Sequence, residues 1–288
     1  MKDIPTSPRI ALIKRNRRVL RLRLIILFSV LFISIIGGLS YFSSNPKIVI
    51  NKIEIKGNSI IDGVELEQRV KDKLQGRYLG LFSRSNFLIY PHDRIYKNLL
   101  KEFPRIENLS VYRVGFNNLK IEITERAGSY LYCGLTIPEN KDDVGENCYF
   151  VNNDGYIFDK APYFSGDIYF KYYTKIEGDV TNPLSSQMIP VDRFHDIVRF
   201  IDGIKNLGFK PSYLVIDDKG IYSLYLKTKV DDSNSKIIFK EDNDLDTILN
   251  NLTIAMSKQE FANEINSKYD SLLYIDLRFK NKVLYKFQ

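Results

Sequence analysis

An uninterrupted apolar segment near the N-terminus constrains the fold of this chain more than any other feature. Leu24–Phe42 is a run of 19 residues without a charged side chain. At about 1.5 Å per residue, a helix of that length spans about 29 Å, close to the roughly 30 Å hydrocarbon core of a bilayer. The segment therefore predicts one transmembrane helix over residues 24–45. A cleaved signal peptide, the alternative, would have a shorter apolar region ending at small residues.

The positive charge of the chain is concentrated before this segment. The formal net charge is +7, and residues 1–23 contain eight of the 42 Lys and Arg residues but a single acidic residue. The rest of the chain is balanced in charge, so we expect no phosphate-tracking surface and no nucleic-acid partner. By the positive-inside rule the basic tail of residues 1–23 is cytoplasmic. We therefore expect a single-pass type II plasma (inner) membrane protein whose bulk is periplasmic or extracytoplasmic.

Residues 47–126 carry the pattern of a small domain with the element order β-α-α-β-β. Its helices are predicted to begin near Asp62, a suitable N-cap residue, and at Pro91, a suitable first helical residue. Two helices on one face of a three-stranded sheet would bury their apolar stripes and leave the sheet edges exposed. Three segments alternate apolar and polar residues as strands do: Lys47–Lys56, Leu109–Val114 and Leu119–Thr124.

Residues 127–288 are predicted to form a second, mixed β-rich domain with flanking helices. Asp154-Gly155 is a typical hairpin turn, and helical periodicity predicts helices over Asp192–Leu207 and Leu245–Met256. The chain is expected to end in a β-hairpin, Leu272–Phe279 and Lys282–Gln288, with its turn at Lys280-Asn281. The expected fold class of the whole chain is α+β with one N-terminal transmembrane helix.

Runs of residues in both predicted domains resemble the FtsQ/DivIB family of cell division proteins. In the first domain these are Phe103-Pro104-Arg105-Ile106, Val111-Tyr112-Arg113, Leu119-Lys120-Ile121-Glu122-Ile123 and Glu125-Arg126. The run Ile53-Glu54-Ile55-Lys56-Gly57-Asn58, followed by a capped helix, is similar to a POTRA module. The terminal run Tyr274-Ile275-Asp276-Leu277-Arg278-Phe279 is the most specific match. The resemblance implies a POTRA-like domain at 47–126 and an FtsQ-type β domain at 127–288. It also implies a non-catalytic divisome scaffold at the septum, which binds small bitopic proteins of the FtsB and FtsL type and links early division proteins to septal wall synthesis.

The resemblance further implies a partner-binding site, because the family binds FtsB through its last strands. A partner strand could add to the last strand by backbone hydrogen bonds, and alternate side chains would select it. The alternative is that the apolar residues of this strand belong to the core. The candidate partner-binding residues are Tyr274, Val283, Leu284, Tyr285, Lys286 and Phe287.

The sequence offers little that could support catalysis. His92 and His195 are the two histidines, and neither accompanies a nucleophile motif or metal-ligand spacing. We therefore predict that the chain is not an enzyme, holds no metal or cofactor and has no small-molecule substrate. The alternative function is a POTRA-containing envelope transport or secretion component. In the barrel-assembly class that uses such modules, lipid-facing strands of about ten residues would be expected, and none is visible.

Cys133 and Cys148 are a candidate disulfide pair. They flank a polar stretch, Pro138–Asn147, that is expected to be a loop between two strands. The oxidising side of a membrane permits the bond. Two free thiols remain the alternative, because the sequence does not fix the separation of the two residues.

Overall fold

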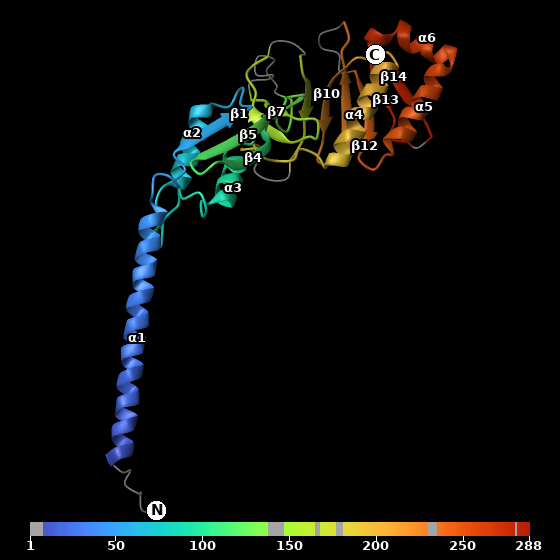
Figure 1. Ribbon diagram of the computed structural model, residues 1–288. Coiled ribbons are helices and arrows are strands. Elements are labelled where there is room, and N and C mark those ends of the chain that lie inside the picture. The colour runs from blue at the N-terminus through green and yellow to red at the C-terminus, as the bar shows by residue number, and fades with distance from the viewer. Residues whose placement is uncertain (1–7, 138–146, 165–167, 177–180, 230–234, 280) are drawn as a thin grey trace, which may run out of the picture. The chain divides into compact units, whose positions relative to one another are not determined.

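The computed structural model divides the chain into two compact units, Met1–Glu125 and Arg126–Gln288. The structure describes residues 8–137, 147–164, 168–176, 181–229, 235–279 and 281–288. These residues form six α-helices, a three-stranded sheet, a nine-stranded sheet and a two-stranded hairpin (Figure 1). The fold is therefore a mixture of helices and strands with one large sheet and one apolar N-terminal helix.

Helix α1 (Pro8–Ser43) is one continuous helix of 36 residues (Figure 1). A window within Arg17–Ser43 has a mean hydropathy of 2.5 and is not buried by the rest of the protein. Helix α1 is thus long and apolar enough to cross a membrane. At about 1.5 Å per residue, the 36-residue helix is about 54 Å long. This length exceeds the thickness of the hydrocarbon core of a bilayer, about 30 Å.

The first unit contains a three-stranded sheet in the order β1-β5-β4. Strand β5 is central because it pairs parallel with β1 and antiparallel with β4. Leu119, Ile121 and Ile123 of β5 are buried while the residues between them are more exposed, as the alternation of the sequence predicts. The strand bounds are β1 (Lys52–Lys56), β4 (Ile106–Val114) and β5 (Asn118–Glu125).

Helices α2 (Gly63–Leu74) and α3 (His92–Glu102) cover this sheet. The side chain of Asp62 caps α2 by accepting a hydrogen bond from the backbone N–H of Val64 at 2.8 Å. Each helix buries one apolar stripe against the sheet, in agreement with its periodicity. The buried residues are Leu66, Val70 and Leu74 of α2 and Ile95 and Leu99 of α3.

A short hairpin between these two helices was not predicted from the sequence. It consists of β2 (Arg77–Tyr78) and β3 (Phe82–Ser83), which pair antiparallel. Hydrogen bonds fasten the hairpin and the segment after it to the C-terminal end of α1. The Ser83 N–H donates to Ser43 Oγ at 3.1 Å, and the Asn86 side chain donates to the Ser43 carbonyl at 3.0 Å.

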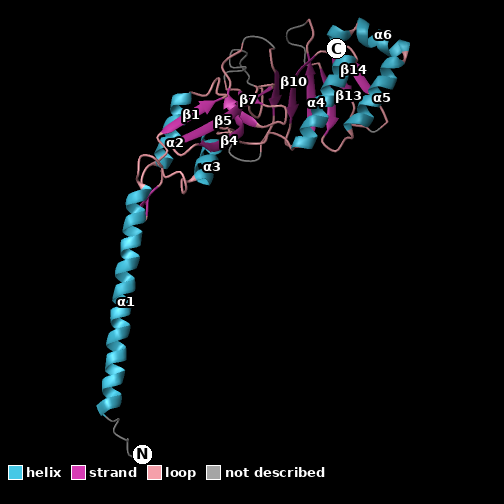
Figure 2. Ribbon diagram, viewed as in Figure 1, coloured by secondary structure: helices cyan, strands magenta, loops and turns pink. Residues whose placement is uncertain are grey.

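The second unit is built on a nine-stranded mixed sheet in the order β14-β13-β12-β11-β10-β9-β6-β7-β8. Helices α4 (Val191–Asn206), α5 (Leu245–Ser257) and α6 (Gln259–Ser267) flank the sheet (Figure 2). Their apolar residues form one core with the inward residues of the strands. The strand bounds are β6 (Tyr130–Tyr132), β7 (Tyr149–Val151), β8 (Ile157–Lys160), β9 (Phe170–Tyr173), β10 (Pro211–Ile216), β11 (Ile221–Leu226), β12 (Lys236–Lys240), β13 (Leu272–Asp276) and β14 (Leu284–Phe287).

Three elements of this unit were absent from the sequence prediction: β6, β9 and α6. Strand β9 pairs parallel with both β6 and β10, so it joins the two halves of the sheet. The terminal strands pair antiparallel as expected. Of the predicted turn at Lys280-Asn281, Lys280 lies outside the described residues, as does most of the predicted loop Pro138–Asn147.

Candidate functional site: a free sheet edge

The last strand of the chain lies at an edge of the large sheet. Strand β14 pairs with β13 on one side and is the terminal strand of the order. Among the described strands it has no second neighbour, so its outer side presents backbone N–H and C=O groups without a strand partner. Such an edge can accept an additional strand from another chain.

One face of β14 is turned toward helix α6. The ring of Tyr285 packs edge-to-face on Phe261, with 5.0 Å between the ring centroids. Its hydroxyl donates to Glu264 Oε2 at 2.8 Å. Val283 and Phe287 are half-buried and pack against the main core. On this face Val283 and Phe287 therefore contribute to the core, as the alternative to partner binding expected. Tyr285 is attached to the helix by its hydroxyl group.

The opposite face of β14 is open. Leu284 is 45% exposed, and Lys286 is exposed beside it. Lys286 is the cross-strand partner of Tyr274 on β13, and Leu284 is the partner of Asp276. A large apolar side chain that stays exposed on an unpaired edge is available to an incoming chain.

The open face continues as a row of direct cross-strand partners. Tyr274 is paired with Lys236, Lys236 with Tyr225, and Tyr225 with Tyr213. The Tyr213 and Tyr225 rings stack at 4.6 Å, and Lys236 Nζ lies 5.4 Å from the centroid of the Tyr225 ring. Burial raises the pKa of Tyr213, which therefore stays neutral. Such cross-strand pairs stabilise the sheet, and here they present aromatic and cationic groups side by side up to the free edge.

An ion pair fixes the end of strand β13. The Asp276 carboxylate accepts from Arg278 Nε at 2.9 Å and from Arg278 Nη2 at 2.6 Å. Burial raises the pKa of Asp276, but the hydrogen bonds from Arg278 outweigh burial and lower it overall. Both residues belong to the terminal run that resembles the FtsQ/DivIB family. The run thus contains an ion pair between residues two positions apart at the end of β13.

The structure brings the six candidate residues together, on β13, on β14 and directly before it. The sequence interpretation missed the groups that surround them, namely Phe261 and Glu264 of α6 and Lys236 of β12. For α6 the spacing of Phe261 and Ile265, four residues apart, was a usable signal of a helix face. The position of Lys236 beside Tyr274 follows from a parallel pairing that sequence spacing does not encode.

The structure joins Cys133 and Cys148 in a disulfide. Cys148 is buried in a small cluster with Leu131 and Ala161, and Cys133 is half-buried at its margin. The bond links the end of β6 to the residue before β7, two strands that already pair in the sheet. The disulfide therefore reinforces the pairing of β6 with β7. In the strand order, these two strands are far from the edge strand β14.

The described partners of the two histidines are carboxylate and carbonyl oxygens. His195 Nε2 lies 3.0 Å from Asp154 Oδ1, and His92 lies 3.0 Å from Asp93 and 3.1 Å from the Val111 carbonyl. Both are partly exposed, and the hydrogen bonds account for their positions. Within the described part of the chain, no group of three or more His, Cys, Asp or Glu side chains could hold a metal ion.

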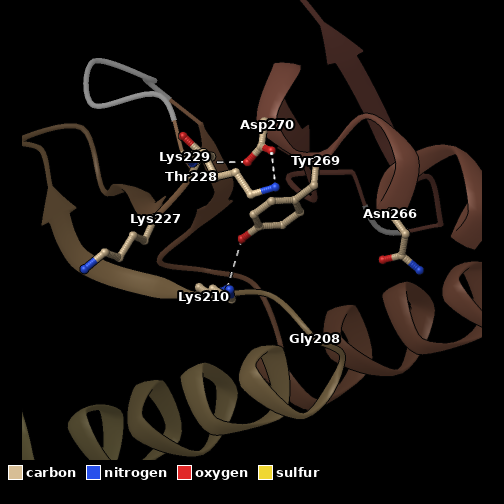
Figure 3. Close-up of a pocket in the computed structure, with 8 residues that line it drawn as sticks. All are labelled: Gly208, Lys210, Lys227, Thr228, Lys229, Asn266, Tyr269 and Asp270. Carbon is tan, nitrogen blue, oxygen red and sulfur yellow. Dashed lines mark hydrogen bonds and ion pairs between the residues drawn. The ribbon is translucent and has the colours of Figure 1, made fainter.

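A surface pocket of the second unit lies between the β10–β11 region and the segment before β13. Figure 3 shows Tyr269 inside it, with its hydroxyl accepting from the backbone N–H of Lys210 at 3.1 Å. Asp270 accepts from the backbone N–H of Lys229 and lies 3.5 Å from its ammonium group. The acidic and phenolic groups of the pocket are thus engaged with its lysines. The described residues that line it include no histidine, serine or cysteine, so this part of the pocket shows no nucleophile paired with an imidazole base.

No family model matches this chain, and a search of curated proteins finds no match either.

Proposed function

We propose that this chain is a non-catalytic cell division scaffold of the FtsQ/DivIB type, which binds small bitopic membrane proteins at the division septum. In this proposal helix α1 crosses the plasma membrane with the basic tail in the cytoplasm and both folded units outside. The observation that carries the proposal is the free edge of β14, with Leu284 and Lys286 exposed on its open face. The scaffold links early division proteins to septal wall synthesis.

Binding proceeds by addition of a partner strand to β14. Backbone hydrogen bonds supply affinity, and alternate side chains supply selectivity. Leu284 offers an apolar contact, and the row that contains Lys286, Tyr274 and Lys236 favours a segment that carries acidic and aromatic residues. A partner with a short extracytoplasmic segment of this composition fits the edge.

The first unit supports the proposal by its element order. A strand, two helices and two strands follow one another in β1, α2, α3, β4 and β5, with the small hairpin β2–β3 inserted between the helices. This order is similar to that of a POTRA module. In this chain the order follows directly after an apolar N-terminal helix. The sequence resemblance implies the same arrangement.

Co-purification with FtsB- and FtsL-like bitopic proteins tests the proposal. We expect Leu284→Glu combined with Lys286→Glu to weaken capture at least about tenfold, equivalent to about 1.4 kcal/mol. Both side chains lie on the open face, where they would neighbour the side chains of an added strand. The matched control is Ile168→Glu, an exposed apolar residue of the same unit at 68% exposure. Full-strength capture by the double variant, with unchanged circular dichroism, would contradict the proposed site.

Localisation separates this function from an envelope transport role. A fluorescent fusion of the full chain is expected to form a midcell band, whereas a transport or secretion component would label the membrane uniformly. Protease added to the outer face of intact spheroplasts is expected to digest residues beyond 47. Protection of that region would contradict the orientation.

A further inference from the structure

The tip of the β2–β3 hairpin exposes an apolar side chain that the fold itself does not use. Leu79 is 94% exposed. It occupies the first central position of a turn in which the Leu81 N–H donates to the Tyr78 carbonyl at 2.9 Å. Its φ of 49° and the φ of 72° at Gly80 are both positive, as a type I′ turn requires.

Leucine is an unfavourable choice at this position. The first central residue of a type I′ turn is usually Asn, Asp or Gly, because these residues tolerate the left-handed region. Leu79 therefore strains the backbone and also exposes its side chain to water. Leu79 is not part of the core of the first unit. This indicates that its side chain contacts something other than the protein itself.

Hydrogen bonds place this hairpin along the last turn of helix α1. Ser83 is bound to Ser43, and two residues nearer the tip the Leu81 carbonyl accepts from the Ser40 hydroxyl at 2.7 Å. Moving from Ser83 toward the tip therefore corresponds to moving back along α1 toward its N-terminus. Figure 2 shows a short strand beside the C-terminal end of α1.

This pairing sets the level of the tip against the apolar segment. Ser40 lies two residues before Phe42, where the apolar segment ends, and thus about 3 Å inside it along the helix axis. Leu79 lies beyond Leu81 toward the tip and so reaches at least that level. Tyr41, 86% exposed, marks the same level with a ring of the type that favours the membrane–water interface.

The surroundings of the tip have the composition of an interfacial membrane contact. Arg77 lines a hollow with Gly37, Ser40 and Tyr41, which brings a cation to the end of the apolar helix segment. Leu88 is 69% exposed in the segment that Asn86 fastens to Ser43. Exposed apolar side chains next to a basic side chain are typical of protein segments that lie in a lipid interface.

We propose that the hairpin tip Leu79–Leu81 inserts into the outer leaflet of the bilayer that α1 crosses, with Leu79 among the acyl chains and Arg77 at the level of the lipid phosphates. This inference rests on the proposed membrane span of α1. The continuity of the tip with that helix identifies the occupant as the lipid around it. The hairpin then fixes the first unit against the membrane surface.

The chain contains no tryptophan, so single-tryptophan variants report on this contact directly. Full-length Leu79→Trp and Leu81→Trp are reconstituted in phosphatidylcholine vesicles with and without brominated acyl chains. We expect a blue-shifted emission and loss of most of the fluorescence in brominated lipid for both. Leu81 has no positive φ, so this variant keeps the test valid if tryptophan at position 79 disturbs the turn.

Two further variants separate the possible failures. Ile60→Trp, at a residue that is 68% exposed before α2, is expected to keep a water-exposed emission without quenching. Phe32→Trp, in the middle of the apolar segment, is expected to be quenched. Unquenched emission from positions 79 and 81, with quenching at position 32, would overturn the inference and leave the span intact. Absence of quenching at position 32 would overturn the span itself.

Discussion

The phenol oxygen of Tyr285 lies 2.8 Å from Glu264 Oε2, so the last strand of the sheet is fastened to helix α6 by one hydrogen bond. The same bond raises the pKa of Tyr285. It also lowers the pKa of Glu264, together with a hydrogen bond from Lys268. The proposed binding edge is therefore held from its helix side by a carboxylate whose pKa lies below its ordinary value.

Tyr285→Phe is expected to raise the pKa of Glu264 toward its ordinary value, because the largest cause of its depression is removed. A carboxyl with a depressed pKa in the folded state contributes stability above its ordinary pKa and loses it as the pH falls. The variant should therefore lose less stability than the wild type as the pH falls below the ordinary pKa of 4.5. Carbon-detected NMR titration of the Glu264 carboxyl measures the shift. Tyr96→Phe, at 37% exposure in the first unit, is the control, and an unchanged Glu264 pKa in Tyr285→Phe would contradict the bond.

Glu125→Gln is expected to destabilise the first unit by about 1–3 kcal/mol, because hydrogen bonds to a charged acceptor are stronger than neutral ones. Glu125 Oε1 accepts from the backbone N–H groups of Ser59, Ile60 and Ile61 at 2.6, 3.0 and 3.0 Å. Burial raises the pKa of Glu125, but these bonds outweigh it and lower the pKa overall.

The pH dependence of that variant gives a second readout. The stability from Glu125 is present above its ordinary pKa of 4.5 and is lost as the pH falls below that value. The difference in unfolding free energy between wild type and Glu125→Gln should therefore shrink in acid. Urea unfolding at several pH values measures it. Glu107→Gln, at an exposed site on β4, should show no such change.

Gly57→Ala is expected to cost about 3 kcal/mol or more of unfolding free energy, because a steric collision adds to the strain of a left-handed backbone. The φ of Gly57 is 85°, and a Cβ atom there would collide with the carbonyl oxygen of Ile123. Gly115→Ala is a matched control, because its φ is 70° and nothing lies within 4 Å of the added carbon. The control should cost about 1–2 kcal/mol from the left-handed conformation alone. Equal losses of unfolding free energy in the two variants, measured by thermal or urea unfolding, would contradict the close contact between Gly57 and Ile123.

Replacing Cys133 and Cys148 together by Ala is expected to destabilise the second unit by about 2–4 kcal/mol, the range typical of a lost disulfide. Unfolding of the first unit should be unaffected, because both cysteines belong to the second. Alkylation with and without reductant, followed by mass spectrometry, measures the state of the thiols. Labelling of both cysteines without reductant would contradict the disulfide.

Long periodic runs made much of this fold predictable from the sequence. The alternation of Leu119, Ile121 and Ile123 predicts β5, and the buried stripe of α4 follows its apolar spacing. Strands β6 and β9, of three and four residues, are too short to show an alternation. Their existence depends on pairing with each other, which is a property of the tertiary fold.

The candidate site was predictable only as a segment. The sequence identifies the last strand, but it does not give the neighbours of that strand. Lys286 lies beside Tyr274 because of a register that contains an irregular step between Leu272 and Tyr274. Glu264 comes to Tyr285 from 21 positions earlier in the chain, and the packing of its helix against β14 is a property of the tertiary fold.

Ser43 has a consequence for how the protein transmits motion. Its hydroxyl and carbonyl oxygens accept hydrogen bonds from Ser83 and Asn86. The end of α1 is therefore attached directly to the β2–β3 hairpin and the segment after it. A tilt or axial rotation of the helix therefore moves the β2–β3 hairpin and the segment after it. If α1 crosses a bilayer as proposed, a torque from neighbouring helices would reach the first folded unit through these bonds.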